Sequence, residues 1–163
     1  MLHDQLYRVE EHTVKTGEGY EFALPVMSGP DCVTVCPVIG DYVVVVRQHR
    51  YVLGMETFEL PAGHVEPGQS PEQAAAAELR EETGFTAGSF VALGSSFATG
   101  GIKVRSYAFI ATDLRETVND ASVLDAEPML FAWSDALALA AETDLMPSTS
   151  QAVLLSAARQ LGV

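Results

Sequence analysis

The segment GHVEPGQSPEQAAAAELREETGF, residues 63–85, is the most informative part of this chain. It places Glu78, Glu81 and Glu82 within about one turn of a predicted helix, where residues three and four apart share a face. Like charges at this spacing destabilise a helix by roughly a few tenths of a kcal/mol per pair, so a bound cation would account for the cluster. Hard divalent ions such as Mg²⁺ prefer oxygen ligands and often bridge to substrate phosphates.

The predicted helix has sequence signals at both ends. Ser70, Pro71 and Gln73 are typical of an N-cap, a first helical position and the partner in a capping box. Gly84 stands where a left-handed residue would end the helix. Upstream, residues 57–60 predict a short strand, which the following Pro-Ala-Gly ends. The unit is therefore a strand, a tight loop and a helix whose acidic face looks back toward the loop.

This unit resembles the Nudix box, the signature of the Nudix hydrolases. In that pattern a Gly is followed after five residues by Glu, and after seven more by Arg-Glu-apolar-x-Glu-Glu-x-Gly-apolar. Two positions depart from it, because Gln69 replaces the first Glu and Ala77 replaces the Arg. The positions that match are Gly63, Glu78, Leu79, Glu81, Glu82, Gly84 and Phe85.

The two departures remove residues of opposite charge, so neither leaves a charged partner behind. We hypothesise that Gln69 and Ala77 replace a supporting polar contact, which would leave the site looser or the activity weaker. A competing interpretation of the glutamates is an ordinary solvated face in an acidic protein. The Gly-to-Gly spacing and the preceding ELPAG favour the metal site.

The composition predicts one domain, residues 1–163, and limits its partners. The formal net charge is −13 with nine Lys and Arg, which argues against nucleic acid and anionic membranes as partners. A bound metal would reverse the sign of the charge at the site, so an anionic substrate is still compatible with the acidic composition.

Apolar runs such as residues 43–46 are too short to span a bilayer, and residues 1–10 do not resemble a signal peptide. A cytoplasmic protein is expected, with Cys32 and Cys36 as buried free thiols.

The rest of the chain predicts an α/β fold. Helices separated by a mixed sheet indicate an α/β/α sandwich, preceded by a small N-terminal antiparallel β-sheet within residues 1–30, and the Nudix resemblance implies the same. Ser134 is expected to cap one late helix, and Ala152, Leu155 and Ala158 to form the apolar stripe of the next. The other expected strands are residues 7–14, 20–27, 32–39, 42–47, 90–96, 103–111 and 129–133, and the late helices are residues 134–141 and 148–161.

The resemblance covers nearly the whole chain and points to the ADP-ribose pyrophosphatase group. Two strands precede the core, as in that group, where they form a sheet that often packs across a homodimer. Residues 47–51, RQHRY, resemble a Gln-x-Arg motif ahead of the box, and residues 59–63, ELPAG, resemble the group's approach to it. Residues 127–158 follow the group's order of strand, helix, loop and helix.

The resemblance implies roles for residues of the box and of a late loop. Metal binding falls to Glu78, Glu82 and the Ala62 carbonyl, with Glu81 either sharing a metal or acting as the base. Relatives often take their general base from a flexible late loop, here residues 119–128. Glu127 is the first candidate there, so the expected catalytic residues are Glu81, Glu82 and Glu127. Further candidates for the base are Asp125 and Glu116, whereas His64 is expected to be exposed and not catalytic.

Three arginines are candidates for binding substrate phosphates, because a guanidinium can fork onto two phosphate oxygens. Arg50 is the first choice, and Arg47 and Arg105 are the others; the competing interpretation is an ordinary surface arginine. Tyr51 and Phe97 could stack on a base, although aromatic residues more often belong to the core.

The resemblance implies a pyrophosphohydrolase that uses Mg²⁺, with Mn²⁺ as a substitute. The expected substrate is a nucleoside diphosphate joined to another group, with ADP-ribose first, cleaved to AMP and ribose 5-phosphate. Two alternatives are an enzyme for another sugar nucleotide or a dinucleotide, and a nucleotide-binding module that has lost catalysis, as Gln69 and Ala77 would favour. An RNA-end hydrolase is disfavoured by the scarcity of basic residues.

Overall fold

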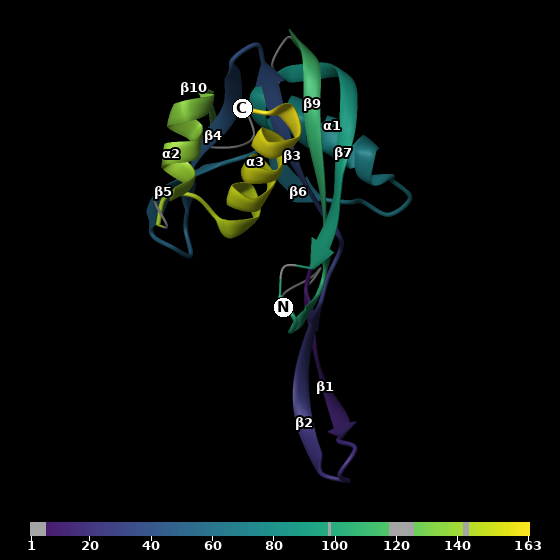
Figure 1. Cartoon of the computed structure of the whole chain (residues 1–163). Helices are drawn as coiled ribbons and strands as arrows, with labels where there is room; N and C mark the ends of the chain where they lie inside the picture. Colours follow the sequence, from purple (N-terminus) through teal and green to yellow (C-terminus); the bar gives the residue numbers. More distant parts are fainter. Residues whose placement is uncertain (1–5, 98, 118–125, 142–143) are drawn as a thin grey trace.

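A body of sheet and helices carries a long projecting hairpin, the arm (Figure 1). This computed structural model describes residues 6–97, 99–117, 126–141 and 144–163. The strands are β1 (Arg8–Lys15), β2 (Glu21–Ser28), β3 (Cys32–Ile39), β4 (Tyr42–Arg50), β5 (Met55–Glu59), β6 (Ala62–His64), β7 (Phe85–Phe97), β8 (Ile102–Lys103), β9 (Arg105–Glu116) and β10 (Glu127–Ala132). The helices are α1 (Pro71–Thr83), α2 (Trp133–Ala141) and α3 (Ser148–Leu161).

The body is an α/β/α sandwich around a mixed sheet, as predicted. The strand order is β10-β4-β3-β9-β7, with β5 paired to β4 and β6 paired to β3. β3 runs parallel to β9, and the other pairs in this sheet are antiparallel. Successive side chains of a strand point to opposite faces. Val33 and Val35 of β3 therefore pack in the core under α1, whereas Cys36 packs in the core under α2 and α3.

The sheet opens between its two central strands. β3 and β4 pair only at Val38↔Val43 and Ile39↔Tyr42. Beyond these pairs the strands diverge, and the facing edges are taken by β6 along β3 and by β5 along β4. Residues 55–64 thus cross from one central strand to the other, and this crossing lies beside α1.

Helix α1 begins and ends where its sequence signals predict. The Gln73 N–H donates to Ser70 Oγ at 3.2 Å, and Gln73 Oε1 accepts from the Ser70 N–H at 2.9 Å, which completes the capping box. Gly84 ends the helix with φ of 73°, a left-handed conformation that favours glycine. The first and last turns of α1 are therefore stabilised by contacts between residues close in sequence, without tertiary contacts.

Two details of the late helices correct the sequence predictions. Helix α2 begins at Trp133, whose side chain is buried and whose N–H donates to Asp41 O at 3.3 Å, so Ser134 lies inside the helix and is not its N-cap. In α3 the buried stripe contains Val153 and Leu154, and Leu155 is 54% exposed. Ala158 is buried as predicted, but the prediction was wrong for Ala152 and Leu155, because the apolar run of residues 153–155 leaves the choice of face to the packing against the sheet.

The arm consists of β1, β2 and the turn between them; the strands pair antiparallel from Arg8↔Ser28 to Lys15↔Glu21, which confirms the predicted N-terminal sheet. The two-residue strand β8 joins it in parallel through Met27↔Ile102, a pairing that the sequence did not predict. Most of the arm is exposed, including several large apolar side chains, which are Val9, Tyr20, Phe22 and Leu24.

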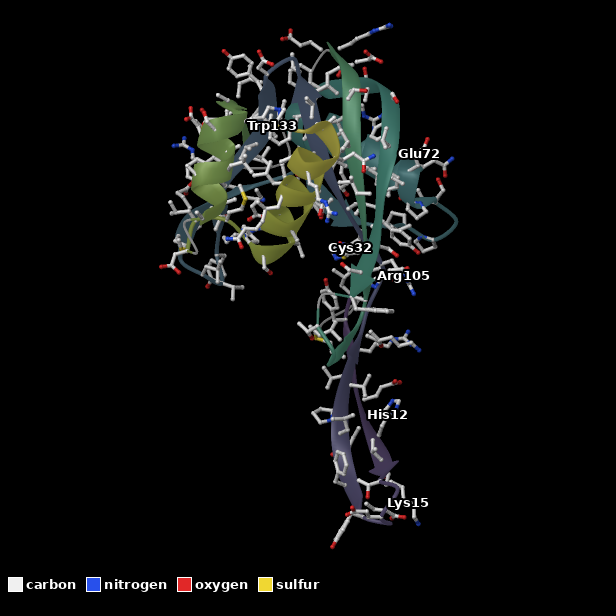
Figure 2. All side chains as sticks on the ribbon, viewed as in Figure 1. His12, Lys15, Cys32, Glu72, Arg105 and Trp133 are labelled. Carbon is white, nitrogen blue, oxygen red and sulfur yellow. The ribbon has the colours of Figure 1, made fainter. Side chains whose placement is uncertain are left out.

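The two cysteines differ in burial. Cys36 is completely buried, but Cys32, which was also expected to be buried, is only partly so because it lies where the arm joins the body (Figure 2). Both thiols are free. Among the described residues, no helix has the length and hydropathy needed to cross a membrane.

Candidate active site

Helix α1 holds its three glutamates at different depths. Glu82 is 8% exposed, Glu78 is partly buried, and Glu81 is exposed and paired with Arg80 at 3.3 Å. Leu79, in the same turn, is completely buried in the core under the helix. This anchor fixes the rotation of α1, so that Glu78 and Glu82 flank the buried face.

Strand β6 lies against two of these carboxylates. The Ala62 N–H donates to Glu82 Oε2 at 3.1 Å. A Cβ built on Gly63 would lie 1.9 Å from Glu78 Oε1, so with Glu78 in this position only glycine fits there. Two successive residues of one short strand thus position two of the three glutamates.

Burial is the main reason why two of the glutamates resist ionisation. It raises the pKa of Glu78 to about 7, and the charge on Glu81 adds to the effect. Burial also raises the pKa of Glu82 to about 7; the hydrogen bond from Ala62 opposes this rise, the charge on Glu78 adds to it, and the charge on Arg50 opposes it. A divalent cation would favour the ionised form of both carboxylates, because it binds them only when they have lost their protons.

The donor set fits a hard divalent cation. Glu78, Glu82 and the Ala62 carbonyl would supply oxygen ligands, and the exposed Glu81 would be a further one. No trio of His, Cys, Asp or Glu side chains in the described ranges closes around a single ion. An open site of this kind is usual for Mg²⁺, which is often held by one or two carboxylates and keeps waters or phosphates in its other positions. The assignment of these residues as ligands stays a prediction.

Arg50 lies beside this cluster, held by a carboxylate that sequence reasoning missed. Its guanidinium forms a bidentate pair with Glu59, at 2.7 Å for Nε to Oε1 and 2.6 Å for Nη2 to Oε2. Glu59 is 4% exposed and also accepts from Thr57 Oγ1 at 2.6 Å. The hydrogen bond to Glu59 raises the pKa of Arg50, while the charge of Arg50 lowers that of Glu82. The one signal for Glu59 was a charged residue between the apolar Phe58 and Leu60 in the predicted strand.

Arg47 and Glu127 lie opposite each other on β4 and β10 and form an ion pair. The structure therefore joins a predicted phosphate-binding residue to the first candidate for the general base. Of the other two candidates, Glu116 ends β9 opposite Phe85, and Asp125 lies outside the described residues.

Arg105 belongs to a different part of the sheet. Its Nη1 donates to Ser95 Oγ at 3.1 Å, and its guanidinium carbon lies 4.7 Å from the centre of the Phe97 ring. Both partners belong to β7, the edge strand separated from β4 by β3 and β9. Arg105 also lies at the base of the arm (Figure 2). The fold therefore places Arg105 apart from Arg47 and Arg50 on β4.

The two candidate aromatic residues are exposed, not part of the core. Tyr51 is 91% exposed at the turn between β4 and β5, and Phe97 is 56% exposed.

The two residues that depart from the Nudix pattern, Gln69 and Ala77, make no unusual contact in the structure. Gln69 Oε1 accepts from the Glu66 N–H at 3.0 Å, and Ala77 is partly buried on α1. Their coupling stays a hypothesis.

Comparisons with known proteins agree with this geometry. The family model described as NUDIX domain matches residues 30–149, which includes the crossing, α1 and the sheet. A solved structure titled as that of an ADP compounds hydrolase has a TM-score of 0.85 at 20% identity, and the match covers 99% of this chain and 90% of that one. At this identity the likeness shows the fold.

Curated relatives match over shorter stretches. An ADP-sugar pyrophosphatase of Mus musculus is 45% identical over 60 residues, 34% of this chain and 28% of that protein. The ADP compounds hydrolase NudE of Escherichia coli (strain K12) is 33% identical over 89 residues, 51% of this chain and 46% of that protein. An ADP-ribose pyrophosphatase of Bacillus subtilis (strain 168) is 40% identical over 63 residues, 38% of this chain and 34% of that protein. The chain therefore spans less than half the length of these relatives.

Proposed function

This chain belongs to the NUDIX domain family, and on that basis we propose that it hydrolyses the diphosphate bridge of a nucleoside diphosphate derivative, with ADP-ribose as the first substrate. Water would form a bond to one phosphorus, and the bond from the bridging oxygen to that phosphorus would break. The products would be AMP and ribose 5-phosphate. The names of the similar proteins, which include ADP-sugar and ADP-ribose pyrophosphatases, support this substrate class.

The observation that carries the proposal is the pair of partly desolvated glutamates, Glu78 and Glu82, held against β6 with pKa values raised to about 7. These residues and the Ala62 carbonyl would hold Mg²⁺, with Mn²⁺ as a substitute and Glu81 as a further ligand or base. When bound, a divalent ion supplies charge neutralisation for the diphosphate and a more acidic water. The chain itself supplies fixed oxygen donors and partial exclusion of solvent.

Arg50 would bind the substrate's phosphates beside the glutamates, and Arg47, on the same strand, stays a candidate for the same role. Arg50 is prepared for this by its bidentate pair with Glu59, which fixes the plane of the guanidinium and leaves its side chain 45% exposed. Arg47 is paired with Oε2 of Glu127, so the other carboxylate oxygen of Glu127 stays available to accept a proton from water. Glu81, which is itself paired with Arg80, and Glu82 are the other candidates for the base.

A second copy of this chain is the partner that we propose for the arm. A two-stranded hairpin is marginally stable by itself, and this one exposes Val9 and Tyr20, each 71% exposed, together with Phe22 and Leu24. Light scattering after gel filtration should give twice the chain mass, and Phe22→Ser with Leu24→Ser should give the monomer. Nucleic acid and membranes are not expected partners, and a cytoplasmic location stays a prediction.

The test of function is a substrate panel. Purified protein would be incubated with ADP-ribose, another ADP-sugar, GDP-mannose and NADH, with Mg²⁺, with Mn²⁺ and with chelator, and nucleotide products would be separated by chromatography. Release of AMP from ADP-ribose with metal but not with chelator supports the proposal. Faster turnover of another compound would change the substrate. ADP-ribose binding by calorimetry without AMP release would select the non-catalytic module, which Gln69 and Ala77 favour.

A further inference from the structure

Strand β6 connects the glutamates to the base of the arm. Ala62 donates to Glu82 at 3.1 Å, and Gly63 backs onto Glu78. The next residue, His64, is partly buried and not exposed as expected, and its Nε2 lies 3.0 Å from the hydroxyl oxygen of Tyr7. Three successive residues therefore contact, in turn, two candidate metal ligands and the segment that leads into β1.

Tyr7 is held at the junction of arm and body. Its ring packs edge-on to His64, with centroids 6.0 Å apart. A Cβ built on Gly29, in the connection from β2 to β3, would lie 2.4 Å from a ring carbon of Tyr7. The ring thus fills the space above that connection, close to Cys32, the register partner of His64, which Figure 2 labels at the junction.

We propose that Tyr7 is a positioning residue for the active site: through His64 it holds β6 in the place where Ala62 and Gly63 align Glu82 and Glu78. This proposal rests on the function proposed above. It also makes the base of the arm part of the catalytic architecture.

The shortness of β6 explains why one side-chain contact matters. The strand has three residues, and its ladder runs along β3. Backbone bonds from the Val35 N–H to Pro61 O and from the Val65 N–H to Asp31 O hold its two ends, and the Tyr7 contact adds a side-chain restraint at His64. A small displacement of β6 would move together the Ala62 N–H and the backbone of Gly63 that lies against Glu78. Misplacement of groups around a reacting centre lowers the rate steeply.

Tyr7→Phe tests the proposal, because it removes the hydroxyl and keeps the ring. We expect kcat to fall roughly three- to tenfold, the range for one hydrogen bond, with KM changed less than about twofold and more metal needed for half-maximal activity. Tyr42→Phe is the control, since Tyr42 is 50% exposed at the start of β4, outside the arm and the site. His64→Phe should reproduce the effect, the double variant should add nothing further, and His64→Gln should recover part of the rate.

A second measurement does not depend on turnover. In amide NMR spectra of the metal-free protein, Tyr7→Phe should shift the signals of Ala62 and Gly63, and Tyr42→Phe should leave them in place. Calorimetry with Mn²⁺ should show weaker binding for Tyr7→Phe only. If the wild type proves inactive on every nucleotide tested, the proposed function fails, but these two measurements still judge the positioning role. Unchanged amide signals and Mn²⁺ affinity in Tyr7→Phe would overturn it, as would loss of the folded spectrum.

Discussion

Glu82 accepts a hydrogen bond from the Ala62 N–H while its pKa is raised to about 7 by burial. The hydrogen bond therefore fixes the direction of the carboxylate, but it does not offset the cost of holding a negative charge away from water. One backbone donor lowers the pKa of Glu82, and desolvation together with Glu78 raises it further than that donor can offset. A residue in this state gains most from a bound cation, and this balance underlies the predictions that follow.

Glu82→Gln should lower turnover by orders of magnitude and leave the fold intact. The amide oxygen can still accept from Ala62, but the ligand charge is lost. Removing a partly desolvated carboxylate should also leave the metal-free melting temperature unchanged or higher at pH 8. Glu72→Gln, an exposed change in the first turn of the same helix, is the control and should keep full activity. Near-normal turnover of Glu82→Gln would refute the metal assignment.

Gly63→Ala should weaken metal binding more than it weakens the fold. The new Cβ would meet the Glu78 carboxylate at 1.9 Å, and since this group ends a flexible side chain, it can swing away. We expect Mn²⁺ affinity, measured by calorimetry, to fall roughly tenfold or more. Gly17→Ala is the control, because a Cβ there meets nothing within 4 Å. Equal affinities of the two variants would show that Gly63 does not position Glu78.

Stability of the metal-free protein should fall as pH rises from about 5 to 8. The pKa values of Glu78 and Glu82 in the folded chain, about 7, lie above their ordinary value of 4.5, so in this interval the folded chain binds more protons than the unfolded chain. Melting temperatures of wild type and of the Glu78→Gln, Glu82→Gln double variant would be compared across this range. The double variant should show a smaller fall.

Added Mg²⁺ should have the opposite pH dependence, because metal and protons compete for the same carboxylates. The rise in wild-type melting temperature on adding Mg²⁺ should therefore be larger at pH 8 than at pH 6. A pH profile identical in wild type and double variant would contradict this account of the two glutamates.

Arg50→Ala should destabilise the fold as well as impair catalysis. It leaves the Glu59 carboxylate, 4% exposed, without its bidentate partner, at a cost of about 2 kcal/mol in the free energy of unfolding. Urea unfolding would measure this change, with Arg8→Ala on the exposed strand β1 as the control. Adding Glu59→Gln should recover part of the stability but not the activity. A fully stable Arg50→Ala would mean that the pair contributes nothing to folding.

Ala77→Arg and Gln69→Glu should act together. If they replace a supporting contact, turnover with both changes should exceed the product of the separate effects, because the new charges would pair across the loop and helix. The measurement is kcat/KM for the two single variants and the double variant. Strict additivity would remove the coupling hypothesis.

Local signals in the sequence predicted what lies within a few residues, and pairs distant along the chain were missed. The caps of α1 involve Ser70 and Gln73, three residues apart, and both were predicted. The Arg50–Glu59 pair spans nine residues and depends on the pairing of β4 with β5, while the Arg47–Glu127 pair spans 80. Periodicity does not report such pairings, because they are set by strand order and register.

Sequence patterns also did not predict which face of helix α1 is buried. Glu81 and Glu82 are neighbours in the same acidic run, yet one is exposed and the other is 8% exposed. Their difference follows from the rotation of α1, which the burial of Leu79 fixes. The Nudix resemblance supplied candidate roles for both glutamates, but not the contacts that hold them.

The crossing between the central strands leaves no freedom in chain length. Glu59 is the register partner of Val46 and Ala62 that of Thr34, and only Leu60 and Pro61 connect them. Both are engaged, since the Leu60 N–H donates to Ser150 Oγ and Pro61 O accepts from the Val35 N–H. A single inserted or deleted residue would put Glu59 and Ala62 out of step with Arg50 and Glu82. Variation in length should therefore be confined to places such as the turn at the tip of the arm.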